Sequence, residues 1–313
     1  MNIGLDMMGG DFSPLEVVKG VQLYLRESPA KAVLWLVGDE QQVRPLLTEL
    51  GIPAEAVRIV HTSQVIEMNE HPTRALKEKQ QSSIAIGFHL LATGKMDAFI
   101  SAGNTGAMLV GAHYSLKPIE GILRPTISTV LPKENGGTGV LLDVGVNADC
   151  KPENLNQFAV LGSLYAEHIL GIARPRVGLL NIGEEEGKGN ILTKAAYPLL
   201  KENSHIHFIG NIEGRDLLMD KADVMVCEGY TGNVILKLAE SLYTIASRHR
   251  IESEFFDRFD FEYYGGTPLL GVTKPVIIGH GISHGKSFLN MMKLAQKMLE
   301  TDLLGKMKES FLS

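Results

Sequence analysis

The chain has 313 residues, enough for one large α/β domain or two lobes, and its 44% hydrophobic and 21% charged residues are typical of a soluble globular enzyme. Its formal net charge of −6, without a basic run interleaved with aromatic residues, argues against a nucleic-acid-binding protein. Two cysteines make no disulfide framework, the N-terminus lacks signal-peptide features, and no run of about 18 apolar residues could span a membrane. We therefore expect a cytoplasmic protein and leave peripheral attachment to a membrane open.

The N-terminal segment predicts a short strand that ends at Asp6 and a glycine-rich loop after it. Gly9 and Gly10 mark the loop, and Ser13 before Pro14 predicts the N-cap of the next helix. The segment is either a plain turn or a binding loop, since open α/β sheets bind ligands at the carboxyl ends of their strands.

Strands and helices alternate along the rest of the chain. Further strands are expected at residues 32–37, 57–61, 126–131, 140–143, 176–181, 206–209 and 275–278, and at the start of two related segments, 97–107 and 223–233. Helical patterns lie between them, among others to about residue 50 and over residues 73–93 and 156–171. This alternation predicts a doubly wound, mostly parallel α/β sheet with helices on both faces.

Residues 97–107 (DAFISAGNTGA) predict a strand, a loop of small residues and the start of a helix. Gly103 and Gly106 let the backbone approach a ligand closely. Asn104 and Thr105 can cap the helix, whose first N–H groups form an anion site. Most turns of this kind bind nothing, so one such loop is weak evidence for a phosphate site.

Residues 143–155 (DVGVNADCKPENL) place three polar side chains close together after a strand: Asp143, Asn147 and Asp149. They either position a ligand or a cation, or form turns with their own backbone. The ligand spacing of an EF-hand is absent, so calcium is not supported.

The strand over residues 176–181 leads into the segment IGEEEGKGN. Its carboxylates, Glu184 to Glu186, are typical of a solvated loop. Lys188 lies between two glycines just beyond a buried strand and is therefore free to reach an anion.

Residues 223–233 (DVMVCEGYTGN) repeat the design of residues 97–107 at matching offsets. Gly229, Thr231 and Gly232 stand where the first segment has Gly103, Thr105 and Gly106. Two such loops in register favour phosphate binding over plain turns.

Residues 281–285 (GISHG) match the G-x-S-x-G motif and stand between a strand and a helix, the context of a nucleophile elbow. We reject a hydrolase because no histidine follows His284. His280 and His284 have i,i+4 spacing but lie in a glycine-rich loop without a glutamate between them, which argues against zinc. The dinucleotide fingerprint G-x-G-x-x-G is also missing after the first strand.

Together these segments resemble the bacterial phosphate acyltransferase family, the acyl-ACP:phosphate acyltransferases of phospholipid synthesis, where ACP is acyl carrier protein. The similar stretches cover nearly the whole chain: DMMGGD at 6–11, SAGNTGA at 101–107, LLDVGVNADCKPE at 141–153, RVGLLNIGEEEGKGN at 176–190, NIEGRDL at 211–217, EGYTGN at 228–233 and YGGTPLLG at 264–271. The resemblance implies the fold of the isocitrate and isopropylmalate dehydrogenases and of phosphotransacetylase. It also implies a homodimer, and we treat residues 1–313 as a single catalytic domain.

The chain departs from the family pattern in three places. Met7 replaces the usual alanine, Glu228 replaces the usual aspartate, and the interval 234–263 looks shorter than in many relatives. In the family that interval forms a helical projection implicated in membrane association and acyl-chain access. Here it keeps an amphipathic stripe, for which we favour core and dimer packing over membrane contact: Val234, Leu238, Leu242 and Ile245.

The implied reaction transfers a long-chain acyl group from acyl-ACP to inorganic phosphate, giving acyl phosphate and free carrier protein. Phosphate is itself the nucleophile and a thiol with a pKa of about 8.5 leaves readily, so no serine or cysteine nucleophile is needed. The site must position two anionic partners and stabilise the tetrahedral oxyanion. We expect neither a metal nor a cofactor.

We assign the residues as follows. Lys188 holds the phosphate or the oxyanion, Asn181 orients it, and His280 is a candidate proton donor. Substrate- and phosphate-binding residues are expected at Asp6, Gly9, Gly10, Ser101, Gly103, Asn104, Thr105, Gly106, Asp143, Asn147, Glu228, Thr231, Gly232 and Asn233. Expected partners are the acyl carrier protein, a second copy of the chain, and a downstream glycerol-phosphate acyltransferase. The carrier is acidic, so we also expect basic contacts, with these candidates: Arg174, Arg176, Lys194, Arg215, Arg248 and Arg250.

Three alternatives stay open on the sequence. The first is a phosphotransacetylase acting on short acyl-CoA. The second is a dehydrogenase that uses NAD and a divalent metal. The third is a non-catalytic scaffold at the membrane surface.

Overall fold

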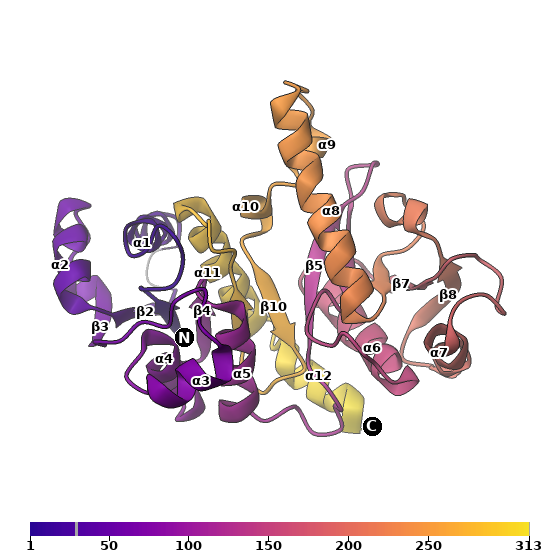
Figure 1. Ribbon diagram of the computed structural model, residues 1–313, viewed down its shortest axis with the longest axis horizontal. Helices are drawn as coiled ribbons and strands as arrows, with labels where there is room; N and C mark the ends of the chain where they lie inside the picture. Colours follow the sequence, from indigo (N-terminus) through magenta and orange to yellow (C-terminus); the bar gives the residue numbers. More distant parts are fainter. Residues whose placement is uncertain (29–30, 313) are drawn as a thin grey trace. The chain divides into compact units, whose positions relative to one another are not determined.

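The computed structural model describes residues 1–28 and 31–312, which form an α/β fold (Figure 1). The chain divides into two compact units. Unit 1 contains residues 1–117, 261–268 and 272–300, and unit 2 contains residues 118–260, 269–271 and 301–313. That the whole chain acts as a single catalytic domain stays a prediction.

Unit 1 is built on parallel strands in the order β3-β2-β1-β4-β11. Their bounds are β1 (Asn2–Asp6), β2 (Val33–Gly38), β3 (Val57–His61), β4 (Ala98–Ser101) and β11 (Val276–Ile278). The central strand β1 places Ile3 opposite both Leu34 and Ala98. All of β4 is buried, because a parallel strand covered on both faces must be apolar throughout.

The helices of unit 1 form two groups that lie on opposite sides of these strands (Figure 1). One group is α1 (Leu15–Glu27), α2 (Glu40–Glu49) and α11 (Gly285–Glu300), and the other is α3 (Pro72–Glu78), α4 (Ser83–Ala92) and α5 (Thr105–Ser115). The unit also holds α10 (Phe261–Tyr264) and a 3₁₀ turn, Ala54–Ala56. The helical pattern over residues 73–93 is therefore two helices, since the Ser82 hydroxyl accepts the Ala85 N–H and starts a new one.

Unit 2 begins with an antiparallel hairpin and continues with parallel strands, in the order β5-β6-β9-β7-β8. Its strands are β5 (Thr126–Pro132), β6 (Thr138–Leu142), β7 (Arg176–Leu180), β8 (His207–Ile212) and β9 (Val224–Val226). The last residues of β10 (Thr267–Leu270) pair antiparallel with β5. The predicted mostly parallel α/β sheet is thus confirmed.

The helices of unit 2 are α6 (Pro152–His168), α7 (Ile191–Glu202), α8 (Gly229–Arg248), α9 (Glu254–Asp257) and α12 (Leu303–Leu312), with a 3₁₀ helix, Gly214–Leu218. Helix α6 packs on β6, β7 and β9, and also contacts α7 and α12. Strand β10 and helices α9, α10 and α12 were not predicted from the sequence.

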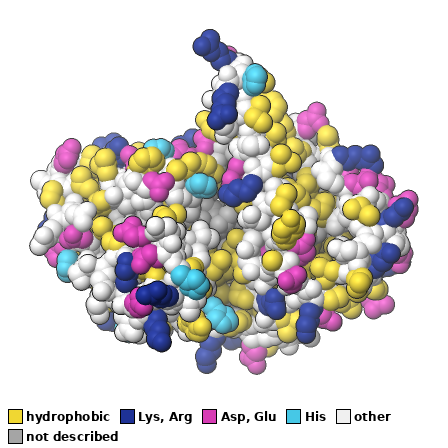
Figure 2. All heavy atoms as spheres, viewed as in Figure 1, with side chains coloured by type: hydrophobic (Ala, Val, Ile, Leu, Met, Phe, Trp, Pro, Cys, Tyr) yellow, Lys and Arg dark blue, Asp and Glu magenta, His cyan; other side chains and the backbone are white. Residues whose placement is uncertain are grey.

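Helix α8 extends away from the strands of its own unit, and hydrophobic side chains line one side of it (Figures 1 and 2). Val234 is 54% exposed, Leu238 64% and Ile245 48%. The expectation that this stripe packs in the core is therefore wrong, whereas dimer packing stays a prediction. Among the described helices, none is long and apolar enough to cross a membrane.

An aspartate stands before each of two corresponding strands and ties it to its neighbour. The Asp97 carboxylate accepts the Asn2 N–H at 2.7 Å, and the Asp223 carboxylate accepts the Arg176 N–H at 2.9 Å. Asp223 also pairs with the buried Lys133 ammonium at 2.5 Å and with the Arg176 guanidinium. The repeat seen in the sequence thus includes a structural role for its first residue.

This network predicts acid sensitivity. Burial opposes ionisation of Asp223, but hydrogen bonds from Arg176 and Lys133 outweigh it and hold its pKa well below the ordinary value of 3.8. A carboxyl whose pKa is lower in the folded state stabilises the fold above its unfolded pKa, and this contribution is lost as pH falls below about 4. We expect the urea midpoint to fall less steeply with acidification in Asp223→Asn than in the wild type. The exposed Asp149→Asn should keep the wild-type slope, and equal slopes in all three proteins would contradict the prediction.

Candidate active site

In unit 1 a buried carboxylate joins the loops that follow β1 and β4. The Ser101 hydroxyl donates to Asp6 Oδ2 at 2.6 Å and accepts the Gly103 N–H at 2.9 Å. The Met8 N–H donates to Asp6 Oδ1 at 2.9 Å. Burial raises the pKa of Asp6 above its ordinary value of 3.8, because its hydrogen bonds offset only part of the desolvation. The structure brings Asp6, Ser101 and Gly103 together, and their contacts fix the shape of the loops, whereas a role in binding phosphate stays a prediction.

Two glycines in the first loop meet steric requirements. A Cβ on Gly9 would lie 2.6 Å from the Gly103 nitrogen and would also collide with the Asp6 carboxylate. Gly10 has a φ of +109°, which strongly favours glycine. Ser13 does not cap α1, and its hydroxyl donates instead to the Gly9 carbonyl.

Asn104 caps α5, as predicted, and its side chain is fully engaged. Its Oδ1 accepts the Ala107 N–H at 2.9 Å. Its Nδ2 lies 3.0–3.2 Å from the carbonyl oxygens of Glu67, Met68 and Glu70. Asn104 therefore holds the start of the helix against the loop before α3.

The first N–H groups of α5 remain available. Gly106 lies against Pro72, where a Cβ would collide. Within residues 1–28 and 31–312, no hydrogen bond from the N–H of Thr105 or Gly106 is found. These groups at a helix N-terminus can take an anion.

His280 lies in the loop after β11, beside the glycine-rich loop. Its ring packs against Phe261 with centroids 5.0 Å apart and the ring planes tilted by 30°, and the carbonyl of the next residue, Gly281, accepts the Asp11 N–H at 2.7 Å. Ser283 is only 2% exposed and accepts a hydrogen bond from the Ser287 hydroxyl. It is not an exposed nucleophile, which agrees with the rejection of a hydrolase.

In unit 2 the Asp143 carboxylate is fully buried and gathers backbone donors. Oδ1 accepts the N–H groups of Gly145 and Val146 at 3.2 Å, and Oδ2 accepts both the backbone and the side-chain nitrogen of Asn147 at 2.7 Å. The Asn147 amide also donates to the Pro125 carbonyl. Of the two roles that the sequence left open for these residues, turn formation is what the structure contains, and an orienting role toward a ligand stays a prediction.

The start of α8 differs from that of α5. The Glu228 carboxylate caps it, accepting the Tyr230 N–H at 2.6 Å, the Thr231 N–H at 3.1 Å and the Thr231 hydroxyl. Gly232 packs on the Asp143 carbonyl so closely that no Cβ would fit, and Asn233 donates to the Val144 carbonyl. The Glu228 carboxylate itself therefore occupies this helix N-terminus. A phosphate at the same place would find these N–H donors already used and would be repelled by the carboxylate charge.

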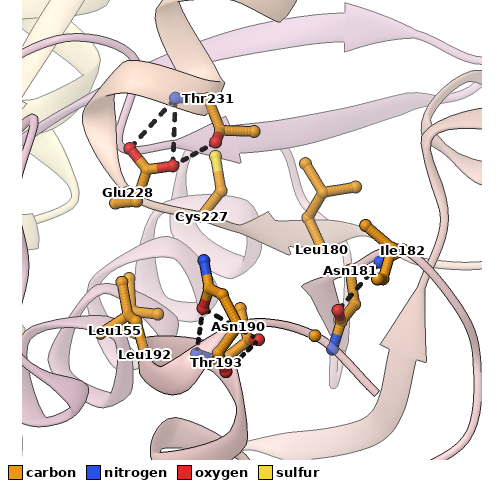
Figure 3. Close-up of a pocket in the computed structure, with 11 residues that line it drawn as sticks. Leu155, Leu180, Asn181, Ile182, Asn190, Leu192, Thr193, Cys227, Glu228 and Thr231 are labelled. Carbon is orange, nitrogen blue, oxygen red and sulfur yellow. Dashed lines mark hydrogen bonds between the residues drawn. The ribbon is translucent and has the colours of Figure 1, made fainter.

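A pocket of about 340 Å³ lies at the carboxyl ends of β7 and β9, within unit 2 (Figure 3). It is lined by Leu155, Leu180, Asn181, Ile182, Gly189, Asn190, Leu192, Thr193, Cys227, Glu228 and Thr231. Three predicted site residues, Asn181, Glu228 and Thr231, thus share one cavity. Cys227 is buried, and burial raises the pKa of its thiol well above 9.0, so it is a poor nucleophile.

Lys188 lies on an exposed loop that two asparagines hold. Asn181 Nδ2 donates to the Lys188 carbonyl at 3.1 Å, and Asn211 Nδ2 donates to the Glu185 carbonyl at 2.9 Å. The ammonium of Lys188 has no ion pair with any residue that the structure describes. Gly189 lines the pocket and Lys188 directly precedes it, so the backbone of Lys188 lies next to the cavity, although its side chain is not part of the lining.

Three carboxylates close to this loop come within 4.8 Å of one another: Glu184, Glu213 and Asp216. Lys221 lies 2.6 Å from Glu184 and 2.8 Å from Asp216, and Arg215 pairs with Glu213. Lysine and arginine thus compensate this negative charge.

Sequence reasoning missed Asn190. Its Oδ1 accepts the Thr193 N–H at 2.9 Å and so caps α7, while its amide nitrogen points toward the pocket (Figure 3). A sequence signal existed, since an asparagine that follows Gly-Lys-Gly and precedes a helical pattern is a typical N-cap.

Known proteins similar to this chain identify its family. A model of the family described as fatty acid synthesis protein matches residues 1–306. A phosphate acyltransferase of Dictyoglomus turgidum is 43% identical, with 99% of this chain and 97% of that protein covered. The alignment runs over 328 positions, so the relative has residues that this 313-residue chain lacks.

Solved structures show the same fold. A phosphotransacetylase from Streptococcus pyogenes has a TM-score of 0.70 at 19% identity, covering 96% of this chain and 94% of that one. A 4-hydroxythreonine-4-phosphate dehydrogenase from Klebsiella pneumoniae has a TM-score of 0.56 at 13% identity, covering 95% and 97%. The expected likeness to phosphotransacetylases and to a dehydrogenase fold is confirmed.

The family follows from the sequence matches, which extend over nearly the full length of the chain at 43% identity. They make the protein an acyltransferase rather than a scaffold. The chain belongs to the fatty acid synthesis protein family, that of the phosphate acyltransferases.

Proposed function

We propose that this enzyme transfers a long-chain acyl group from acyl-ACP to inorganic phosphate and releases acyl phosphate for phospholipid synthesis. The observation that carries the proposal is a largely apolar pocket at the carboxyl ends of strands in unit 2, lined in part by Gly189, the residue that follows the exposed Lys188. Ser283 of the G-x-S-x-G motif is buried, and burial raises the pKa values of the Cys150 and Cys227 thiols, which fits direct attack by phosphate.

Lys188 is assigned to the developing oxyanion of the thioester carbonyl. An ammonium that forms no ion pair with a described residue, on a loop fixed by Asn181, needs little rearrangement to stabilise that charge. The amide nitrogen of Asn190, which points toward the pocket, is a further donor (Figure 3).

Phosphate is assigned to the start of α5, where the N–H groups of Thr105 and Gly106 are available. Asp6, Ser101 and Gly103 fix the loop before that helix. His280, in the loop that follows β11, remains the candidate proton donor.

The carrier protein and a second copy of the chain are the proposed partners, with a downstream glycerol-phosphate acyltransferase as consumer of the product. Of the six basic candidates for the carrier, Arg176 and Arg215 are engaged in ion pairs, and the other four are exposed. The exposed stripe on α8 supports the homodimer, since a partner copy would cover it. Peripheral membrane contact by this stripe is the alternative.

The test is a hydroxylamine trap for acyl phosphate. Purified protein is incubated with phosphate and either palmitoyl-ACP or acetyl-CoA, and NAD-dependent absorbance serves as control. We expect hydroxamate from palmitoyl-ACP alone. Product from acetyl-CoA alone would make the protein a phosphotransacetylase, and an NAD-dependent change would favour the dehydrogenase alternative.

A further inference from the structure

We infer that the pocket between α6, the start of α7 and the carboxyl ends of β7 and β9 is the subsite for the acyl chain, with the thioester carbonyl at the edge formed by Asn190 and Lys188. This inference rests on the proposed function and adds to it the residues that determine which length of acyl chain the enzyme prefers.

The free surface of the pocket is apolar. Five of its lining side chains are apolar: Leu155, Leu180, Ile182, Leu192 and Cys227. The polar ones largely satisfy each other or the backbone. Asn181 bonds to the Ile182 N–H and the Lys188 carbonyl, the Thr193 hydroxyl donates to Asn190, and Glu228 binds Thr231. A ligand that enters therefore finds hydrocarbon surface and few unfilled hydrogen-bonding groups.

Charge excludes phosphate as the occupant. The Glu228 carboxylate lines the cavity, and its acceptor oxygens take the donors at the start of α8. A phosphate placed there would meet a negative charge and no open N–H group of that helix. A neutral hydrocarbon chain is not repelled by the carboxylate and needs no hydrogen-bond donor.

Size also fits a chain. A methylene group occupies about as much space as a water molecule in the liquid, roughly 30 Å³, so a pocket of about 340 Å³ accepts a segment on the order of ten carbons. Ile182 and Ile191, 81% and 90% exposed, extend the apolar surface beyond the pocket for a longer chain.

The polar edge has the chemistry of a carbonyl site. The amide nitrogen of Asn190 points toward the cavity, and no hydrogen bond from it is found in the described parts of the chain. Lys188 directly precedes Gly189, a lining residue, so its long exposed side chain can bring a positive charge to this edge. With the hydrocarbon inside, the carbonyl oxygen of the thioester is the group that the Asn190 amide and the Lys188 ammonium would meet.

The experiment narrows the pocket and measures chain-length preference. Leu192→Trp fills the cavity from the first turn of α7, and Leu192→Phe does so more mildly. Ala195→Trp adds the same bulk to an exposed position on α7 outside the pocket. We expect the ratio of kcat/KM for palmitoyl-ACP to that for butyryl-ACP to fall at least about tenfold in Leu192→Trp, less in Leu192→Phe, and to stay unchanged in Ala195→Trp. An unchanged ratio in both Leu192 variants would overturn the inference.

Binding of decanoate, measured by calorimetry, separates this inference from the proposed function. We expect the wild type and Ala195→Trp to bind decanoate alike and Leu192→Trp to bind it at least about tenfold more weakly. If no donor yields acyl phosphate but this binding pattern holds, the proposed function fails and the subsite stands. If acyl phosphate forms but the variants bind decanoate equally, the subsite is wrong and the function stands.

Discussion

Lys188→Ala is expected to lower turnover about a hundredfold with little change in the KM for acyl-ACP. The reason is that a cation aimed at the oxyanion acts mainly in the transition state, and removing one such group typically costs two to three orders of magnitude, about 2.7–4 kcal/mol. The ammonium has no ion pair with a described residue and the side chain is exposed, so its loss should leave stability nearly unchanged. Single-turnover rates of acyl phosphate formation, with thermal melting as a check on folding, measure both.

Two variants make this result specific. Lys188→Arg keeps the charge but changes its geometry, so we expect partial activity. Lys201→Ala removes another exposed ammonium, on α7 of the same unit, and should retain near-normal turnover. Near-normal turnover in Lys188→Ala itself would remove this lysine from the mechanism, and equal losses in both alanine variants would indicate general electrostatics instead.

The sequence predicted the fold well because its signals are local. Buried parallel strands are largely apolar, so a run such as residues 275–278 identifies β11 directly. The misses are elements whose existence depends on distant contacts. Strand β10 exists through its pairing with β5, and the two short helices α9 and α10 have only four residues each. In residues 73–93 the apolar residues have helical spacing on both sides of Ser82. Only the N-cap at Ser82 separates the two helices α3 and α4.

The candidate site was less predictable, because a polar residue in a loop can either form hydrogen bonds that stabilise the loop or bind a ligand. The side chains of Asn104 and Asn147 both form hydrogen bonds to backbone carbonyl groups of neighbouring loops. The two matching loops looked equivalent, yet the Glu228 carboxylate accepts the first N–H groups of α8, whereas those of Thr105 and Gly106 in α5 have no partner in the described structure. That difference depends on where each carboxylate or amide points. The direction of a side chain is set by packing, which spacing along the chain does not encode.

Asp143→Ala is expected to destabilise the fold by at least about 3 kcal/mol, since it removes the acceptor of two buried and two part-buried donors and each orphaned buried donor costs about 1–3 kcal/mol. The donors are the N–H groups of Gly145, Val146 and Asn147 and the Asn147 amide. For a domain whose total stability is about 5–15 kcal/mol, this is a large fraction. Urea unfolding followed by circular dichroism measures it.

Asp149→Ala is the matched control, since Asp149 is an exposed aspartate of the same loop, and we expect a change within about 0.5 kcal/mol. Asp143→Asn separates the two roles that the sequence left open. It keeps the shape and one acceptor but turns an NH₂ group toward the donors of Asn147, so a loop-holding role predicts lowered stability. An orienting role toward phosphate predicts instead a raised KM for phosphate at unchanged stability. The second outcome would return Asp143 to the list of ligand-binding residues, and the first would leave it as the residue that shapes the loop on which α8 is packed.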